Sequence, residues 1–147
     1  MEYINESREL RELIRVLERK LGILEKSEAS CCGATFAQCH AIVEIGRVKT
    51  ISLIELAEKV NLDNSTMSRT VNNLVNTNLA ERELDAKDRR YITIKLTGNG
   101  LKIFENIEVG MAIYFQKVTQ SIPKDKVKQV IESLELLVYA INESNCC

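Results

Sequence analysis

The chain contains few of the residues that interrupt regular structure. Its 147 residues include one proline and six glycines. Because helix breakers are scarce and apolar residues recur periodically over long stretches, the sequence predicts a mainly helical protein. No apolar run approaches the length of a membrane span, and Met1–Glu6 lacks the basic start of a secretory signal. We therefore expect a cytoplasmic protein with no membrane partner.

The sequence also lacks the residue constellations of an enzyme. It has one histidine, no nucleophile motif and no paired carboxylates that a pocket would gather. Gly98-Asn-Gly100 is an isolated G-x-G without a preceding β-α-β unit, so it predicts no nucleotide site. We expect a protein that is not an enzyme and that requires no cofactor.

Excess positive charge is absent as well, since the formal net charge is −1. Many nucleic-acid-binding proteins are strongly basic. Any attraction of this chain to nucleic acid must therefore come from a local basic patch, while acidic surface elsewhere limits non-specific adhesion.

What the sequence does contain is a helix-turn-helix pattern. The first helix is expected over Ser52–Val60, where Ser52 and Glu55 have the spacing of a capping box. Its apolar positions are Leu53, Leu56, Ala57 and Val60. A short polar break follows, and Asp63 or Asn64 then caps a second helix over Ser65–Thr77.

The second helix is predicted to have two unlike faces. Its apolar face consists of Met67, Val71, Leu74 and Val75. Its polar face consists of Ser65, Thr66, Ser68, Arg69, Asn72, Asn73 and Asn76. These side chains form hydrogen bonds but carry little charge, which suits reading base edges and gripping phosphates.

A two-stranded hairpin follows the second helix. Alternating strands are expected over Leu79–Leu84 and Tyr91–Leu96, joined by the charged tip Asp85–Arg90. A helix-turn-helix followed by a basic-tipped hairpin is a winged helix-turn-helix, which is a DNA-binding module.

These stretches in order resemble the MarR family of bacterial and archaeal repressors. The resemblance is carried by Asp63–Val71, by the tip Asp85–Arg90, and by Leu96-Thr97 with Gly100. Upstream, Thr35–Ile45 resembles the family's helix before the helix-turn-helix. The resemblance covers about residues 35–101. It implies a mainly α fold with a small β-hairpin wing, in which a winged helix-turn-helix core is flanked by N- and C-terminal dimerisation helices.

The flanking segments agree with a single MarR-type domain over 1–147. An amphipathic helix is expected over Glu6–Leu24, followed by a polar connection from Glu25 to Gly33. Thr35 and Gln38 form a second capping box. Thr97 is expected to cap a helix that ends near Thr119, and Pro123 to begin the last helix. The apolar stripes at 1–30 and 102–147 exceed what the 35–101 lobe can cover, which predicts a homodimer.

The resemblance also implies the residues that contact double-stranded DNA. By position, Ser65, Thr66, Ser68, Arg69 and Asn72 match the family's major-groove and phosphate contacts, and Asn73 lies on the same face. Asp88 and Arg90 match the family's wing D-x-R, in which the arginine enters the minor groove. The aspartate there holds the wing, often by pairing with a recognition-helix arginine such as Arg69. Lys87 and Arg89 are predicted phosphate contacts.

Five cysteines are the clue to an effector, and they occur as Cys31-Cys32, Cys39 and Cys146-Cys147. In a reducing compartment these are thiols, which suit a soft metal or metalloid ion. Cys39 also lies on an apolar helix face, where a buried structural thiol is equally consistent with the pattern. The C-x2-C spacing of a zinc site is absent, and oxidation of a thiol is the second interpretation.

A third interpretation leaves the cysteines incidental, with a small aromatic or phenolic ligand binding between the lobes. The hypothesis that we favour is a repressor that its effector releases from a near-palindromic operator, by shifting the spacing of two recognition helices. A hypothesis from another class is a thiol-rich metal-binding or protein-interaction module without DNA affinity. The operator sequence, the regulated genes and the effector do not follow from the sequence.

Overall fold

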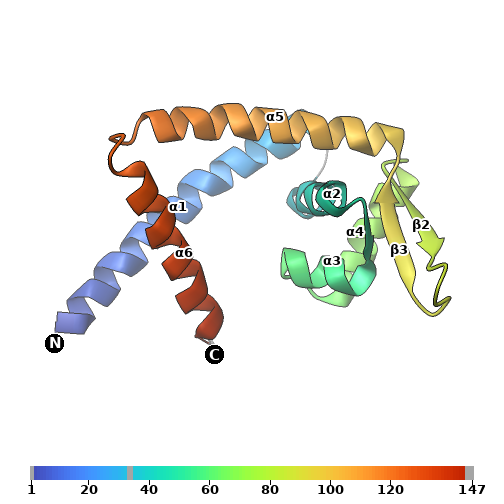
Figure 1. Ribbon diagram of the computed structural model, residues 1–147, viewed down its shortest axis with the longest axis horizontal. Helices are drawn as coiled ribbons and strands as arrows, with labels where there is room; N and C mark the ends of the chain where they lie inside the picture. The colour runs from blue at the N-terminus through green and yellow to red at the C-terminus, as the bar shows by residue number, and fades with distance from the viewer. Residues whose placement is uncertain (1, 33–34, 145–147) are drawn as a thin grey trace. The chain divides into compact units, whose positions relative to one another are not determined.

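The computed structural model describes residues 2–32 and 35–144 (Figure 1). Its elements are α1 Glu2–Cys32, α2 Phe36–Val48, β1 Thr50–Ser52, α3 Leu53–Val60, α4 Asn64–Asn76, β2 Ala80–Leu84, β3 Ile92–Leu96, α5 Gly98–Gln120 and α6 Val127–Glu143. The predicted fold class is therefore confirmed. The chain divides into two compact units, Met1–Ile107 and Glu108–Cys147. Within the described ranges, no helix combines the length and apolar character that crossing a membrane requires.

The predicted helix-turn-helix is formed by α3 and α4. The Ser52 hydroxyl accepts a hydrogen bond from the Glu55 amide at 3.1 Å, and the Asp63 carboxylate accepts one from the Thr66 amide at 3.0 Å. Between the helices, Asn61 adopts the left-handed conformation at φ 58°, which ends α3. The second bond of the predicted capping box, from the Ser52 amide to the Glu55 carboxylate, is replaced by a different one. The Glu55 carboxylate accepts a bond from the Ser52 hydroxyl at 3.1 Å instead of from the backbone, because Ser52 also ends a strand.

A three-stranded antiparallel sheet in the order β1-β3-β2 adjoins these helices. Strands β2 and β3 form the predicted hairpin. Strand β1 was not predicted, because three residues directly joined to a helix are too short to show an alternating pattern. Its central residue Ile51 pairs with Ile94, and both side chains are buried. This strand therefore anchors the base of the hairpin to the core.

The core of the first unit lies where α2 packs against α3, α4 and β3. Its largest fully buried side chains are Ile42, Ile45, Leu56, Met67, Val71, Leu74 and Ile94. Burial of one such side chain contributes roughly 1.5–3 kcal/mol. The predicted Thr35–Gln38 capping box at the start of α2 is confirmed, with bonds of 3.0 and 3.3 Å. Packing on α2 thus holds α4 and the hairpin in one rigid arrangement.

The predicted boundaries of α1 and α6 are wrong. Helix α1 begins at Glu2, whereas Glu6 was expected. Helix α1 continues to Cys32, whereas a polar connection was expected from Glu25. The residues after Glu25 include the good helix formers Lys26, Glu28 and Ala29, and no glycine or proline occurs before Gly33 to end the helix. Helix α6 begins at Val127, whereas Pro123 was expected to begin it. Before it, a turn is closed by the Lys126 amide, which donates to the Pro123 carbonyl at 2.8 Å.

Candidate nucleic-acid interface

Helix α4 has the two unlike faces that the sequence predicted. Met67, Val71 and Leu74 are buried, and Val75 is half-buried. The predicted DNA-contacting side chains of this helix are all exposed or half-buried: Ser65, Thr66, Ser68, Arg69, Asn72 and Asn73. They offer hydroxyl, amide and guanidinium groups, which are the groups that hydrogen-bond to base edges and phosphates. The apolar face thus anchors α4 and leaves a row of hydrogen-bonding groups in solvent.

Asp63 caps α4 as predicted and also bonds two side chains of its first turn. Its carboxylate accepts hydrogen bonds from the hydroxyl of Ser65 and from the hydroxyl of Thr66, the latter at 2.5 Å. These bonds, with the Thr66 amide, hold the pKa of Asp63 far below its usual range. Both hydroxyl protons are thereby committed to Asp63, while the oxygens keep acceptor lone pairs. Among the predicted contact residues of α4, Ser68, Arg69, Asn72 and Asn73 are therefore the donors that Asp63 does not engage.

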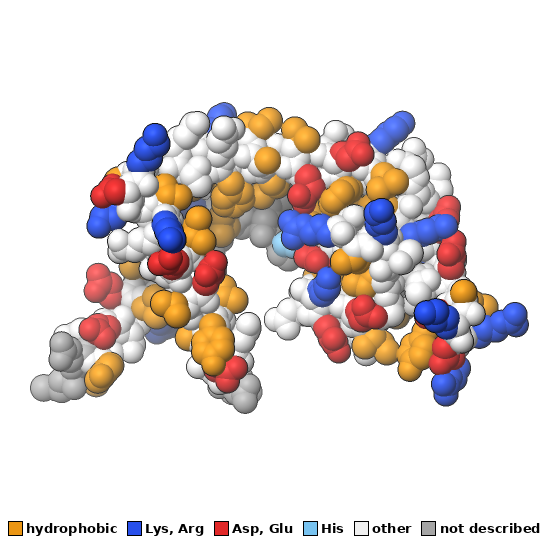
Figure 2. Space-filling view, in the orientation of Figure 1, with side chains coloured by type: hydrophobic (Ala, Val, Ile, Leu, Met, Phe, Trp, Pro, Cys, Tyr) orange, Lys and Arg blue, Asp and Glu red, His pale blue; other side chains and the backbone are white. Residues whose placement is uncertain are grey.

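The tip of the hairpin is shaped by two aspartates. The Asp85 carboxylate accepts a bond from the Lys87 amide at 2.9 Å, and the Asp88 carboxylate accepts one from the Arg90 amide at 3.1 Å. Such turns, in which an aspartate bonds the backbone two residues on, replace regular backbone turns. They place Lys87, Arg89 and Arg90 in solvent, and Figure 2 shows Lys and Arg side chains gathered at the end of the hairpin, with acidic groups between them.

The partner of Asp88 differs from the expectation. Its carboxylate pairs with Arg90, whose Nη2 lies 2.8 Å from Oδ2 and whose Nε lies 3.0 Å from Oδ1. The expected partner Arg69 is not involved in this pair, because the two-residue spacing within the wing brings Arg90 closer. The hydrogen bonds lower the pKa of Asp88 and raise that of Arg90. The wing arginine is thus held against a carboxylate in the absence of DNA.

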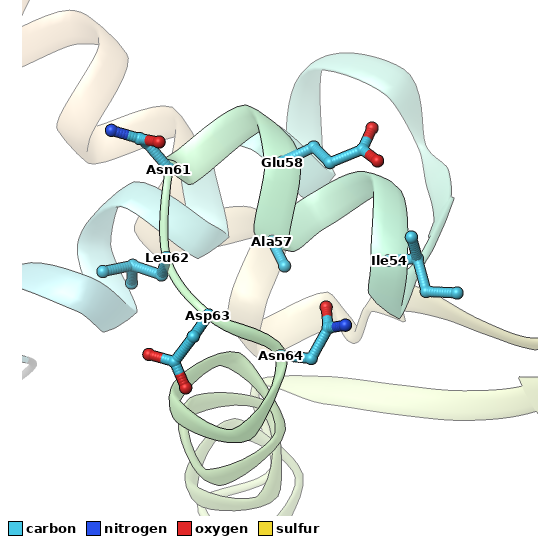
Figure 3. A pocket seen from close by; sticks show the side chains of 7 residues that line it. All are labelled: Ile54, Ala57, Glu58, Asn61, Leu62, Asp63 and Asn64. Atoms are coloured by element: carbon cyan, nitrogen blue, oxygen red, sulfur yellow. The ribbon is translucent and has the colours of Figure 1, made fainter. Parts of the chain in front are cut away.

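An open hollow of about 570 Å³ lies at the turn between α3 and α4 (Figure 3). Its lining residues are Ile54, Ala57, Glu58, Asn61, Leu62, Asp63 and Asn64. The sequence did not single it out, because no motif marks a surface assembled from two helices and their turn. In Figure 3 the carboxylates of Glu58 and Asp63 point to opposite sides of the hollow. The hollow therefore gathers no pair of acids that would indicate metal or acid–base chemistry.

The structure tests the cysteine hypothesis only in part. Cys39 is half-buried on α2. The side chains of Cys31 and Cys32, and all of Cys146 and Cys147, lie outside the part of the chain that the structure describes. Among the described residues, no group of three or more His, Cys, Asp or Glu side chains has the arrangement of a metal site. Thiol chemistry therefore stays a prediction.

Comparison with known proteins identifies the architecture. Residues 33–90 match the MarR family. The HTH-type transcriptional regulator BilQ of Clostridium symbiosum is 30% identical over 112 residues, which cover 76% of this chain and 78% of that protein. The chain belongs to the MarR family. It is accordingly a DNA-binding transcriptional regulator and not an enzyme, as the sequence predicted.

Solved structures of other proteins share the fold over most of the chain. A mutant MarR from Escherichia coli in complex with operator DNA has a TM-score of 0.76 and 27% identity, covering 90% of this chain and 96% of that one. Streptococcus pneumoniae FabT in complex with DNA has a TM-score of 0.82, covers 92% of this chain and 97% of that one, and is 16% identical. The likeness to FabT shows the fold alone.

Proposed function

We propose that this MarR-family regulator is a homodimeric repressor that binds a near-palindromic operator. Each subunit places α4 in the major groove and the wing tip in the adjacent minor groove. The observation that carries the proposal is the exposed row of hydrogen-bonding groups on α4, above the buried Met67, Val71 and Leu74. The operator-bound state of the E. coli MarR mutant supports the same use of the fold here.

The basic groups of the wing support the minor-groove assignment. Arg90 exposes 86% of its side chain although it is paired with Asp88. An ion pair with so exposed an arginine is weak even though Asp88 is half-buried, because water competes for the guanidinium. Arg90 can therefore exchange its carboxylate for the negative potential of a narrow minor groove. Lys87 and Arg89 flank it as phosphate contacts, so the net charge of −1 is compatible with DNA binding.

Apolar side chains left in solvent support the homodimer. In the first unit, α1 carries Leu10, Leu13 and Leu17, with Leu13 62% exposed. In the second unit, the described α6 has no buried residue, and Leu136 and Tyr139 are 71% and 66% exposed. Long apolar stripes of this kind mark protein interfaces. A second copy of the chain buries the same stripe on both partners and presents two recognition helices to successive major grooves.

For the signal, we propose release from the operator through the cysteines, with a soft metal or metalloid ion favoured over an oxidant. Two adjacent thiol pairs and Cys39 supply more soft ligands than the fold requires. Cys39 supports this proposal, because α2 packs against both helices of the helix-turn-helix. Thiolate modification would favour a spacing of the recognition helices that no longer fits successive grooves. The alternative effector is a small aromatic or phenolic molecule.

The proposal is tested by fluorescence anisotropy of the reduced protein on DNA from upstream of its own gene. We expect the wild-type protein to bind this DNA in a salt-sensitive manner, and arsenite or zinc to abolish that binding. In a variant with all five cysteines changed to serine, neither ion should affect DNA binding. Release by peroxide alone favours oxidation, and release by benzoate in both proteins favours the aromatic effector. Tight ion binding with no DNA affinity on any promoter fragment contradicts a repressor and favours the thiol-rich module.

A further inference from the structure

The wing has two faces that the strand register defines. Residues directly opposite each other in an antiparallel pair lie on the same face of the sheet. On one face the pairs are Ala80 with Leu96, Arg82 with Ile94, and Leu84 with Ile92. Ala80, Ile94 and Leu96 are buried, so we call this side the inner face of the wing. The other side, which carries Glu81, Glu83, Thr93 and Lys95, is the outer face.

Charge is divided unequally between these faces. On the outer face, Lys95 Nζ lies 2.5 Å from a Glu83 oxygen and 3.6 Å from a Glu81 oxygen. The hydrogen bond from Lys95 to Glu83 raises the pKa of Lys95, which shows how closely the amine is paired. Two carboxylates and one amine leave the outer face with a net negative charge. That face repels a phosphate backbone.

The inner face has the opposite character. Arg82 is its charged residue and is exposed, and no described residue forms an ion pair with it. Next along the strand, Leu84 is 62% exposed, and Ile92 opposite it is 43% exposed. Arg82, without an ion-pair partner among the described residues, thus lies beside the two exposed aliphatic side chains Leu84 and Ile92. Such a surface suits a partner that carries both negative charge and apolar atoms.

The position of α4 identifies that partner. Helix α4 packs against β2, and Figure 1 shows the hairpin of β2 and β3 beside α4. When α4 occupies a major groove and the wing tip the adjacent minor groove, one sugar–phosphate strand separates the two grooves. That strand must cross the space between α4 and the part of the inner face nearest the wing tip, which carries Arg82, Leu84 and Ile92. It carries phosphates for a guanidinium and deoxyribose rings for aliphatic side chains.

We propose that the inner face of the wing binds this sugar–phosphate strand, with Arg82 on a phosphate and Leu84 and Ile92 against deoxyribose. The inference rests on the proposed operator binding and adds a contact that the motif residues do not include. Arg82 then fixes the depth at which the wing enters the minor groove, because a phosphate contact sets register without reading sequence. Sequence reasoning missed it because a single arginine in a strand matches no motif.

Lys95 supplies a matched control on the same hairpin. Arg82→Gln and Lys95→Gln each remove one positive charge, one from each face. The probe is a labelled duplex that the wild-type protein recovers from a random double-stranded library, and the readout is anisotropy over a series of salt concentrations. Each lost phosphate contact reduces the slope of log K against log salt by about 0.9. We expect Arg82→Gln to lose this amount per subunit and Lys95→Gln to keep the wild-type slope.

The outcomes separate the two levels of the proposal. If the two variants share one slope, the effect is long-range charge and the Arg82 contact is wrong, while operator binding stands. If the wild-type protein recovers no sequence, operator binding fails and the Arg82 contact fails with it. Arg82→Lys retains the charge and should restore the slope, which excludes a folding defect as the cause of the Gln result.

Two further readouts locate the contact. Ethylation of one phosphate between the two occupied grooves should weaken binding of the wild-type protein but not of Arg82→Gln. Leu84→Ser should lower affinity severalfold with no change in salt slope, because contact with deoxyribose releases no counterions. Equal sensitivity of wild type and Arg82→Gln to every ethylated phosphate would overturn the assignment.

Discussion

Arg90 and Asp88 form a two-pronged ion pair at the tip of the wing. The guanidinium donates from Nε at 3.0 Å and from Nη2 at 2.8 Å to the two carboxylate oxygens. The Arg90 amide also donates to Asp88 Oδ1 at 3.1 Å. One aspartate therefore both shapes the turn and holds the side chain that we propose to contact DNA. In the proposed complex, Arg90 leaves the Asp88 carboxylate and contacts DNA, so substitutions of Arg90 and of Asp88 have separate, measurable effects on operator binding.

Arg90→Glu should weaken operator binding and lower its salt dependence by about 1 unit of log–log slope per subunit, because a cation at DNA is replaced by an anion. Asp88→Asn should bind as tightly as wild type or more tightly. The amide side chain still accepts the backbone bond but no longer competes for the guanidinium. Anisotropy titrations at several salt concentrations measure both. If Arg90→Glu binds as well as wild type, the wing assignment is wrong.

A second relationship makes the start of the recognition helix sensitive to acid. Bonds from Ser65 and Thr66 lower the pKa of Asp63, so the folded state binds this proton less readily than the unfolded chain. The stabilisation is present above the unfolded pKa of about 3.9 and is lost as the pH falls towards the lower folded value. Wild type should therefore exceed Asp63→Asn in stability by a constant margin above about pH 5, with the margin shrinking below pH 4.

Urea unfolding followed by circular dichroism between pH 3 and 7 checks this expectation. Asp85→Asn is the comparison, since Asp85 also bonds a backbone amide but lies at the wing tip. A margin between wild type and Asp63→Asn that is the same at pH 3 and pH 6 would show that the charge of Asp63 contributes nothing.

The helix-turn-helix was predictable because its signals are local. Ser52 and Asp63 begin α3 and α4 as caps, and the buried positions of α4 follow from a 3.6-residue period. Strand β1 was not predictable, since Ile51 becomes a strand residue only by pairing with Ile94, which is distant in sequence. Tertiary pairing of this kind leaves no local pattern.

The interface was predictable as a set of residues but not as a set of bonds. Periodicity predicted that Ser65 and Thr66 lie on the polar face of α4. It could not predict that both hydroxyls donate to Asp63, because a hydroxyl rotates freely and its acceptor depends on the positions of the neighbouring side chains. For the same reason the family resemblance suggested Arg69 as the partner of Asp88, whereas the turn geometry brings Arg90 to it. Competition among several nearby partners of one aspartate requires coordinates to resolve.

Gly100 permits the close approach of α5 to the segment that joins α4 to the wing. A Cβ at this position would lie 2.0 Å from the Leu79 carbonyl oxygen, while Thr97 Oγ1 donates to the Asn78 carbonyl at 2.7 Å in the same joint. Gly100→Ala should lower the free energy of unfolding by roughly 1–3 kcal/mol, the usual cost of overpacking. A Cβ at Gly98 would meet no atom within 4 Å, so Gly98→Ala is the control.

Chemical denaturation of both glycine variants measures the difference. We expect Gly98→Ala to match or exceed the stability of wild type, because alanine is favoured over glycine in a helix by about 1 kcal/mol. Equal stability of the two variants would mean that the Leu79 carbonyl can move away at no cost, and that the joint between α4 and α5 is not rigid.

The exposed stripe of α1 predicts the last effect, on assembly. Leu13→Glu places one carboxylate from each subunit in the proposed dimer interface. The lost apolar burial weakens the dimer by roughly 1–1.5 kcal/mol per subunit, which raises the dissociation constant on the order of a hundredfold. Ile54→Glu is a matched control, since Ile54 is 51% exposed but lies on α3. Sedimentation velocity should show monomers for Leu13→Glu and dimers for Ile54→Glu. Because two half-sites must be held together, Leu13→Glu should also make operator binding depend on protein concentration, and a dimer that survives Leu13→Glu would exclude this stripe as the interface.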